Sequence, residues 1–121
     1  MPNSFRFVRG ANQDNTLRAM TQDAKAVAFG STIAIVPSES ENLFQVAQLT
    51  GAATVNATVS QLYIGDKVRV LLSADSTTRV VTFGTNFISA GTLSVTASKA
   101  AYIDFMFNGT ALQEMGRTVT A

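Results

Sequence analysis

The side chains that most often perform chemistry in proteins are sparse in this chain of 121 residues. It contains no histidine and no cysteine, so a catalytic site would have to use Ser, Thr, Lys, Tyr and carboxylate groups. Thiolate nucleophiles, disulfides and zinc–thiolate sites are excluded by composition. No phosphate-binding loop, dinucleotide fingerprint or metal-ligand spacing occurs. We therefore expect a protein that is not an enzyme and that uses no cofactor and no metal.

The carboxylates are spaced like turn and loop residues. Glu39 and Glu41 lie in a Ser-rich stretch, which we interpret as a solvated loop. Asp66 and Asp75 lie in turn-like sequence, where a carboxylate commonly accepts hydrogen bonds from nearby backbone amides. Their spacing does not match the D-x-D-x-D-G pattern of a calcium loop. None of the four therefore points to acid–base catalysis.

Asp104 is flanked by apolar residues in the run YIDFMF. If this run is a strand, alternation puts Asp104 on the opposite face from Ile103 and Phe105. We expect it to face solvent or a partner subunit. In the alternative, a buried Asp104 would require a charged partner such as Arg79 or Arg117.

The charge content is low and nearly balanced. Only 14% of residues are charged, against about 25% in an average soluble domain, and the net charge is +1. Residues 1–25 carry a net +2 and the remainder a net −1. This balance gives no field that would attract nucleic acid. A surface poor in charge suits lasting contact with copies of the same chain or with a partner.

Targeting features are also missing from the sequence as it stands. The start MPNSFRFVRG lacks the basic head and apolar run of a signal peptide. No stretch approaches the ~18 apolar residues that span a bilayer. We expect synthesis in the cytoplasm and no membrane partner.

From residue 26 onward, short β-type runs alternate with glycine-rich and polar turns. Gly30 interrupts the first run and is interpreted as a bulge. The eight predicted strands span residues 26–36, 43–49, 53–59, 67–73, 77–83, 92–97, 100–107 and 110–115. This count and spacing predict an all-β fold, a jelly-roll-like β-sandwich of about eight antiparallel strands. An immunoglobulin-like sandwich is the alternative, because strand order cannot be read from one sequence.

Two turns stand out in the C-terminal half. Asn108-Gly109 lies between two strand patterns, which predicts a tight type I′ hairpin turn. In TFGTNF, Phe83 ends a strand and Phe87 is expected to pack back onto the core after a corner. Gly84 and Gly91 are expected to supply backbone freedom there.

We divide the chain into an N-terminal arm, residues 1–25, and a β-sandwich domain, residues 26–121. The arm is either extended or a short helix. Phe5, Arg6, Phe7 and Arg9 are its candidate partner interface, since an extended segment would place two aromatic rings on one side and a guanidinium on the other. Equally, Phe5 and Phe7 could pack as an edge strand of the domain itself.

The segment 77–118 resembles a module of structural proteins of tailed bacteriophages. In that module a T-F-G-x-x-F strand end is followed by a Gly-Thr-Leu strand, a Phe-x-x-(N/D)-Gly hairpin and an E-x-G-R-T close. The matching residues here are Thr82, Phe83, Gly84, Phe87, Gly91, Thr92, Leu93, Phe105, Asn108, Gly109, Glu114, Gly116, Arg117 and Thr118. Ala111-Leu112 departs from the pattern, because the return strand often carries an aromatic such as Trp.

The resemblance implies a virion protein of the small capsid decoration (cement) or head-fibre type, commonly a homotrimer. A decoration protein would bind the major capsid protein or another virion protein on the capsid surface and hold capsomers together by non-covalent adhesion. A small head or tail fibre, a tail adaptor and a receptor-binding virion protein are the alternatives. A non-viral carbohydrate-binding module is less consistent with the sequence, which has no Trp and only Tyr63 and Tyr102.

Overall fold

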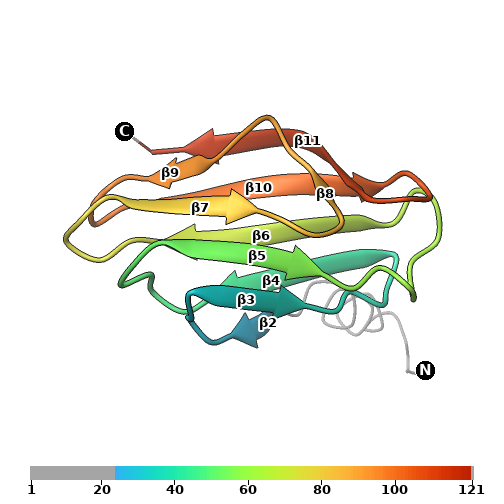
Figure 1. The fold of residues 1–121 in the computed structure, drawn as a ribbon, viewed down its shortest axis with the longest axis horizontal. Helices are drawn as coiled ribbons and strands as arrows, with labels where there is room; N and C mark the ends of the chain where they lie inside the picture. The colour runs from blue at the N-terminus through green and yellow to red at the C-terminus, as the bar shows by residue number, and fades with distance from the viewer. Residues whose placement is uncertain (1–23, 121) are drawn as a thin grey trace, which may run out of the picture.

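The computed structural model describes residues 24–120, which form ten β-strands in two facing sheets (Figure 1). These residues contain no helix, and so none that could cross a membrane. The six-stranded sheet has the order β2-β4-β6-β10-β11-β8 and the four-stranded sheet the order β3-β5-β7-β9. The bounds are β2 Ala24–Val27, β3 Thr32–Ile35, β4 Glu41–Val46, β5 Ala53–Ala57, β6 Lys67–Ser73, β7 Arg79–Phe83, β8 Phe87–Ile88, β9 Leu93–Val95, β10 Ala100–Phe107 and β11 Leu112–Val119.

The first six strands form three stacked coils. Each coil places one strand in each sheet, and the equivalent strands of successive coils pair in parallel: β2 with β4 and β6, and β3 with β5 and β7. Ala24, Leu43 and Arg69 lie side by side, at steps of 19 residues (24 to 43) and 26 residues (43 to 69). This is the arrangement of a short β-solenoid.

The last strands close the stack in the opposite direction. β9 pairs with β7 and β10 pairs with β6, both antiparallel. β11 then pairs antiparallel with β10, and the short strand β8 pairs in parallel with the start of β11. The solenoid therefore ends in an antiparallel closure (Figure 1).

The all-β prediction is confirmed, but the antiparallel jelly roll is wrong. The alternating pattern fixes which side chains point inward, and this pattern is the same for parallel and antiparallel neighbours. The prediction also read residues 26–36 as one strand with a bulge at Gly30. Instead, Gly30 lies in the connection by which the chain passes from β2 in one sheet to β3 in the other. Strand β2 starts at Ala24, across the boundary placed after residue 25.

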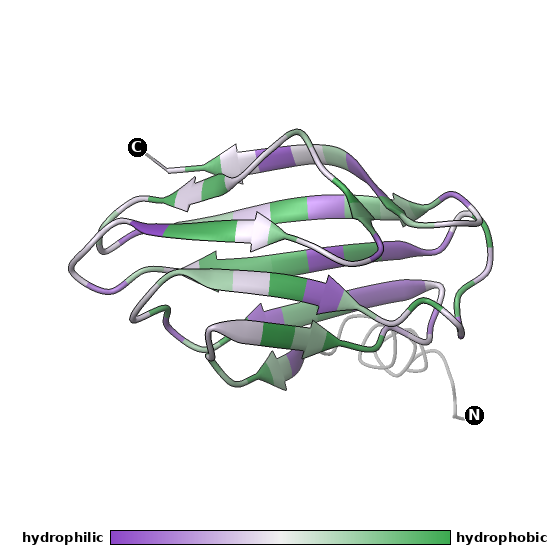
Figure 2. Ribbon diagram, in the orientation of Figure 1, coloured by the Kyte–Doolittle hydropathy of each residue, from purple (hydrophilic) through white to green (hydrophobic). Residues whose placement is uncertain are grey.

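The core lies between the two sheets and consists of inward rows that cross the strands. One row runs through Phe44, Val70 and Ile103 in the six-stranded sheet, and Ile33, Val55 and Phe83 form a facing row in the other. All six side chains are buried. Figure 2 shows green hydrophobic segments on every strand, interrupted on most of them by purple or pale ones, as expected when one face of each sheet is buried.

Candidate functional site

The outer face of the six-stranded sheet carries a recess that combines charged and apolar side chains. We call it the outer groove; its volume is about 420 Å³ and it lies across β4, β6, β10 and β11. Its outward-pointing walls combine apolar and charged side chains. They are Glu41, Leu43, Lys67, Arg69, Leu71, Asp104 and Met115.

An ion pair forms the centre of the outer groove. Arg69 Nε and Nη2 donate to the two carboxylate oxygens of Asp104 at 2.6 and 3.0 Å. The same guanidinium lies over the ring of Tyr102, 4.8 Å from its centroid. Asp104 faces outward as expected, and its partner is Arg69. Arg79 and Arg117, named as partners for a buried Asp104, pair with Asp75 and Glu114 instead. The antiparallel pairing of β6 with β10 sets Arg69 opposite Asp104.

A β-bulge in β11 shapes one wall of the groove. Asp104 is opposite Gly116 and Phe105 is opposite Glu114, so Met115 is the extra residue. Met115 projects into the groove and is 48% exposed. Gly116, the residue after Met115, is the one sequence signal for this bulge, because glycine inside a strand often marks one.

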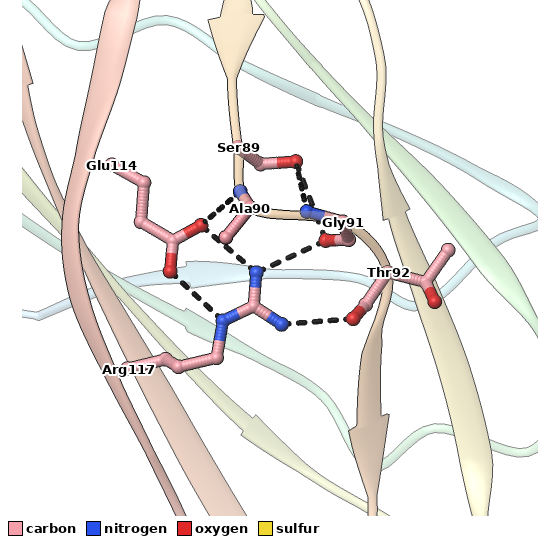
Figure 3. A network of polar contacts seen from close by, with 6 residues as sticks. All are labelled: Ser89, Ala90, Gly91, Thr92, Glu114 and Arg117. Carbon is pink, nitrogen blue, oxygen red and sulfur yellow. Dashed lines mark hydrogen bonds and ion pairs between the residues drawn. The ribbon is translucent and has the colours of Figure 1, made fainter.

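The same bulge makes a second ion pair possible inside the closure. In a regular strand, residues three apart point to opposite faces; the extra residue lets Glu114 and Arg117 point to the same side. Arg117 Nε and Nη2 each donate to Glu114 at 2.8 Å. Figure 3 shows the pair facing the connection between β8 and β9.

The Glu114–Arg117 pair holds that connection through its backbone. Arg117 donates to the carbonyl oxygens of Thr92 at 2.8 Å and Gly91 at 3.0 Å, and Glu114 accepts from the Ala90 amide at 2.7 Å (Figure 3). The Arg117 hydrogen bond is the main cause that lowers the pKa of Glu114 below its ordinary value, against the opposing effect of burial. Because both side chains bond the backbone of the β8–β9 connection, we interpret the Glu114–Arg117 pair as structural and call it the clamp.

An exposed apolar tip lies at the end of the molecule where β5 connects to β6. Tyr63 is 80% and Ile64 is 77% exposed. Their turn is nevertheless fixed: the Asp66 carboxylate accepts from the Tyr63 amide at 2.9 Å, and Gly65 N–H donates to the Phe107 carbonyl at 2.9 Å. We call Tyr63 and Ile64 the tip.

The predicted site residues fall into two groups. Phe5, Arg6, Phe7 and Arg9 lie outside the described residues. Gly84, Gly91, Asn108 and Gly109 all lie in connections between strands. Gly91 and Gly109 have positive φ angles of 127° and 98°, which glycine tolerates best.

Two details of those turns differ from prediction. Gly84 does not have a positive φ; it is required because an added Cβ would overlap Asn56 Oδ1, which accepts from the Thr85 amide at 2.7 Å. The prediction of a type I′ turn at Asn108-Gly109 is also wrong, because Asn108 lacks the positive φ that this turn needs. Its side chain instead accepts from the amides of Thr110 and Ala111, both at 2.9 Å.

The Asp66 and Asp75 predictions are confirmed, because each carboxylate accepts from a nearby backbone amide, those of Tyr63 and Thr77. Asp75 also pairs with Arg79 at 2.8 Å. Phe83 and Phe87 meet edge to face at 5.3 Å, as the corner interpretation expected.

The tip and the outer groove were both missed in the sequence. In the sequence, Tyr63 was considered only as a possible aromatic platform, and nothing distinguishes Ile64 from a residue at the end of a strand. Their exposure depends on how the connection between β5 and β6 folds. The groove depends on which strands are neighbours. Within residues 24–120, no three His, Cys, Asp or Glu side chains are grouped so that they could hold a metal ion.

No protein-family model matches the sequence, and no curated protein matches it.

Proposed function

We propose that this protein is a bacteriophage capsid decoration (cement) protein that binds the outer capsid surface and stabilises capsomer contacts by non-covalent adhesion. The partners would be the major capsid protein and further copies of the chain, as a homotrimer. The virion assignment comes from the resemblance in segment 77–118. The adhesive mechanism is supported by one observation on the described surface.

That observation is the combination of paired charges with exposed large apolar side chains. Between residues 24 and 120, eight of the twelve charged side chains form four ion pairs: Lys25–Glu39, Arg69–Asp104, Asp75–Arg79 and Glu114–Arg117. Apolar side chains remain exposed on the outer sheet face and at the tip. When such a surface packs against another protein, its apolar side chains leave water, and this lowers the free energy of the complex.

Adhesion of this kind requires buried interface area and no catalytic group. A standard interface buries about 1,600 Å² in total, and many copies would add such contacts across the joints between capsomers. A close-packed core between two sheets has low compressibility and would transmit load between neighbouring capsomers.

Particle composition tests the proposal. Quantitative mass spectrometry of purified virions should find the chain in a copy number on the scale of the capsid lattice. A handful of copies would instead support the fibre or tail-adaptor alternative. Absence from the particle would contradict both.

The N-terminal arm provides a second test. A variant without residues 1–15 should stay folded and keep its oligomeric state, yet lose binding to particles, if Phe5, Arg6, Phe7 and Arg9 contact the capsid. A variant without this segment that cannot fold would show that it packs as part of the domain instead.

A further inference from the structure

Two features of the described surface are open to solvent and complement each other. The tip presents the two most exposed large apolar side chains, at 80% and 77%. The outer groove presents a recess of about 420 Å³, within the roughly 300–1,000 Å³ of pockets that enclose ligands. Because Tyr63 and Ile64 are so exposed, they do not occupy the groove of their own chain.

We propose that the tip of one copy of this chain docks in the outer groove of another copy. The groove suits both side chains. Leu43, Leu71 and Met115 offer apolar contact, and a tyrosine hydroxyl can donate to a carboxylate. Glu41 and Asp104 supply such acceptors in the groove wall.

Charge favours a copy of the same chain over other occupants. The four charged groove residues, Glu41, Lys67, Arg69 and Asp104, sum to zero. The one carboxylate beside the tip, Asp66, already accepts from the Tyr63 amide. Nucleic acid or an anionic membrane would gain no net attraction from this face, whereas the apolar tip, with the Asp66 carboxylate beside it, meets no net repulsion from a wall whose charges sum to zero.

Preorganisation reduces the entropy lost on docking. The backbone of the tip is held by the bonds of Asp66 and Gly65 in the free chain, so little is left to order on binding. Each copy carries both parts, and therefore docking is either reciprocal in a two-fold dimer or sequential in a ring. This inference goes beyond the proposed function and needs no virion to test it.

The absence of cysteine permits a direct test. Ile64→Cys and Met115→Cys variants are mixed under mild oxidation, with one of them carrying a larger tag. The cross-linked heterodimer should form at least about tenfold faster than in a control mixture of Ile64→Cys with Thr82→Cys. Thr82 is exposed on the outer face of the four-stranded sheet. Equal rates in the two mixtures would overturn the proposal.

Analytical ultracentrifugation checks the unmodified chain. Wild type should self-associate, and Tyr63→Ser with Ile64→Ser should weaken association by about tenfold or more. Val80→Ser, at a position 40% exposed on the other sheet, is the control and should leave association unchanged. A wild type that remains monomeric up to about 0.5 mM, or a tip variant that associates like wild type, would also overturn it.

Discussion

At the scale of single residues, Gly84 shows why a small side chain is required in the corner after β7. An added Cβ would overlap Asn56 Oδ1 and lie 3.2 Å from Thr54 Cγ2. Asn56 would have to move, and the Thr85 amide would lose its acceptor. We expect Gly84→Ala to lower the free energy of unfolding by about 1–3 kcal/mol.

Gly116→Ala is the matched control for that prediction, measured by urea unfolding. A Cβ at Gly116 has no atom within 4 Å and the φ is not positive. Reduced freedom of the unfolded chain should make Gly116→Ala neutral or stabilising by up to about 1 kcal/mol. Equal effects of the two substitutions would contradict the role given to Asn56.

Glu114 makes stability depend on pH. Its pKa in the folded state lies below the ordinary value of 4.5, chiefly because Arg117 donates to it. The stabilisation is therefore complete above the ordinary pKa and is lost as the pH falls through the lower, folded-state value. Thermal unfolding of wild type should show a falling midpoint over that acidic window.

The Glu114→Gln variant should be less stable near neutral pH and should lose part of this acidic decline. Asp75 contributes in the same window, since Arg79 lowers its pKa too. Asp75→Asn therefore serves as the comparison, and the double variant should flatten the profile further. A Glu114→Gln profile parallel to that of wild type would rule out the clamp as a source of pH dependence.

At the scale of elements, the bulge in β11 can be removed without changing which side chains face inward. Deletion of Met115 leaves Glu114 opposite Phe105 and Gly116 opposite Asp104, the pairing that already exists. We expect this deletion to change the free energy of unfolding by less than about 1 kcal/mol.

Deletion of Gln113 should behave differently, because it would move either Leu112 or Glu114 to the wrong face. Leu112 is fully buried, so a loss of about 3 kcal/mol or more is expected. Denaturant unfolding of both variants gives the comparison. A Met115 deletion as damaging as the Gln113 deletion would show that the bulge itself supports the closure.

The strands themselves were largely predictable, while their neighbours were not. Residues 67–73 and 100–107 were predicted with their observed bounds, because alternation is strong there. The two-residue strand β8 was missed, since Phe87–Ile88 is too short to show any period. The coil repeat was hidden because its steps differ by seven residues, 19 against 26. The Arg69–Asp104 pair could be found only once β6 and β10 were known to be neighbours.

At the scale of the whole molecule, the parallel coils and the antiparallel closure share one core. Val70 is fully buried between Phe44 of an adjacent coil and Ile103 of the closure. Val70→Ala should therefore lower the free energy of unfolding by about 2 kcal/mol. Val80→Ala, at a position 40% exposed, should change it by less than about 0.5 kcal/mol.

Both variants and wild type should unfold in a single transition. Far-UV circular dichroism, which reports all strands, should coincide with the fluorescence of Tyr102 in the closure and Tyr63 at the tip. Two separated transitions would show that the coils and the closure are independent units.

The chain direction reverses at β9 and β10, so the two ends of the stack of coils differ in structure. Parallel coils are repeating units, and β7 and β6 each receive an antiparallel strand where the next unit would add. The closure therefore prevents a further parallel coil from adding at this end. Among the described residues, β2 and β3 form the other end and each has a strand on only one side. Extra coils inserted ahead of β2 would therefore lengthen the body without changing the strand pairing of the closure.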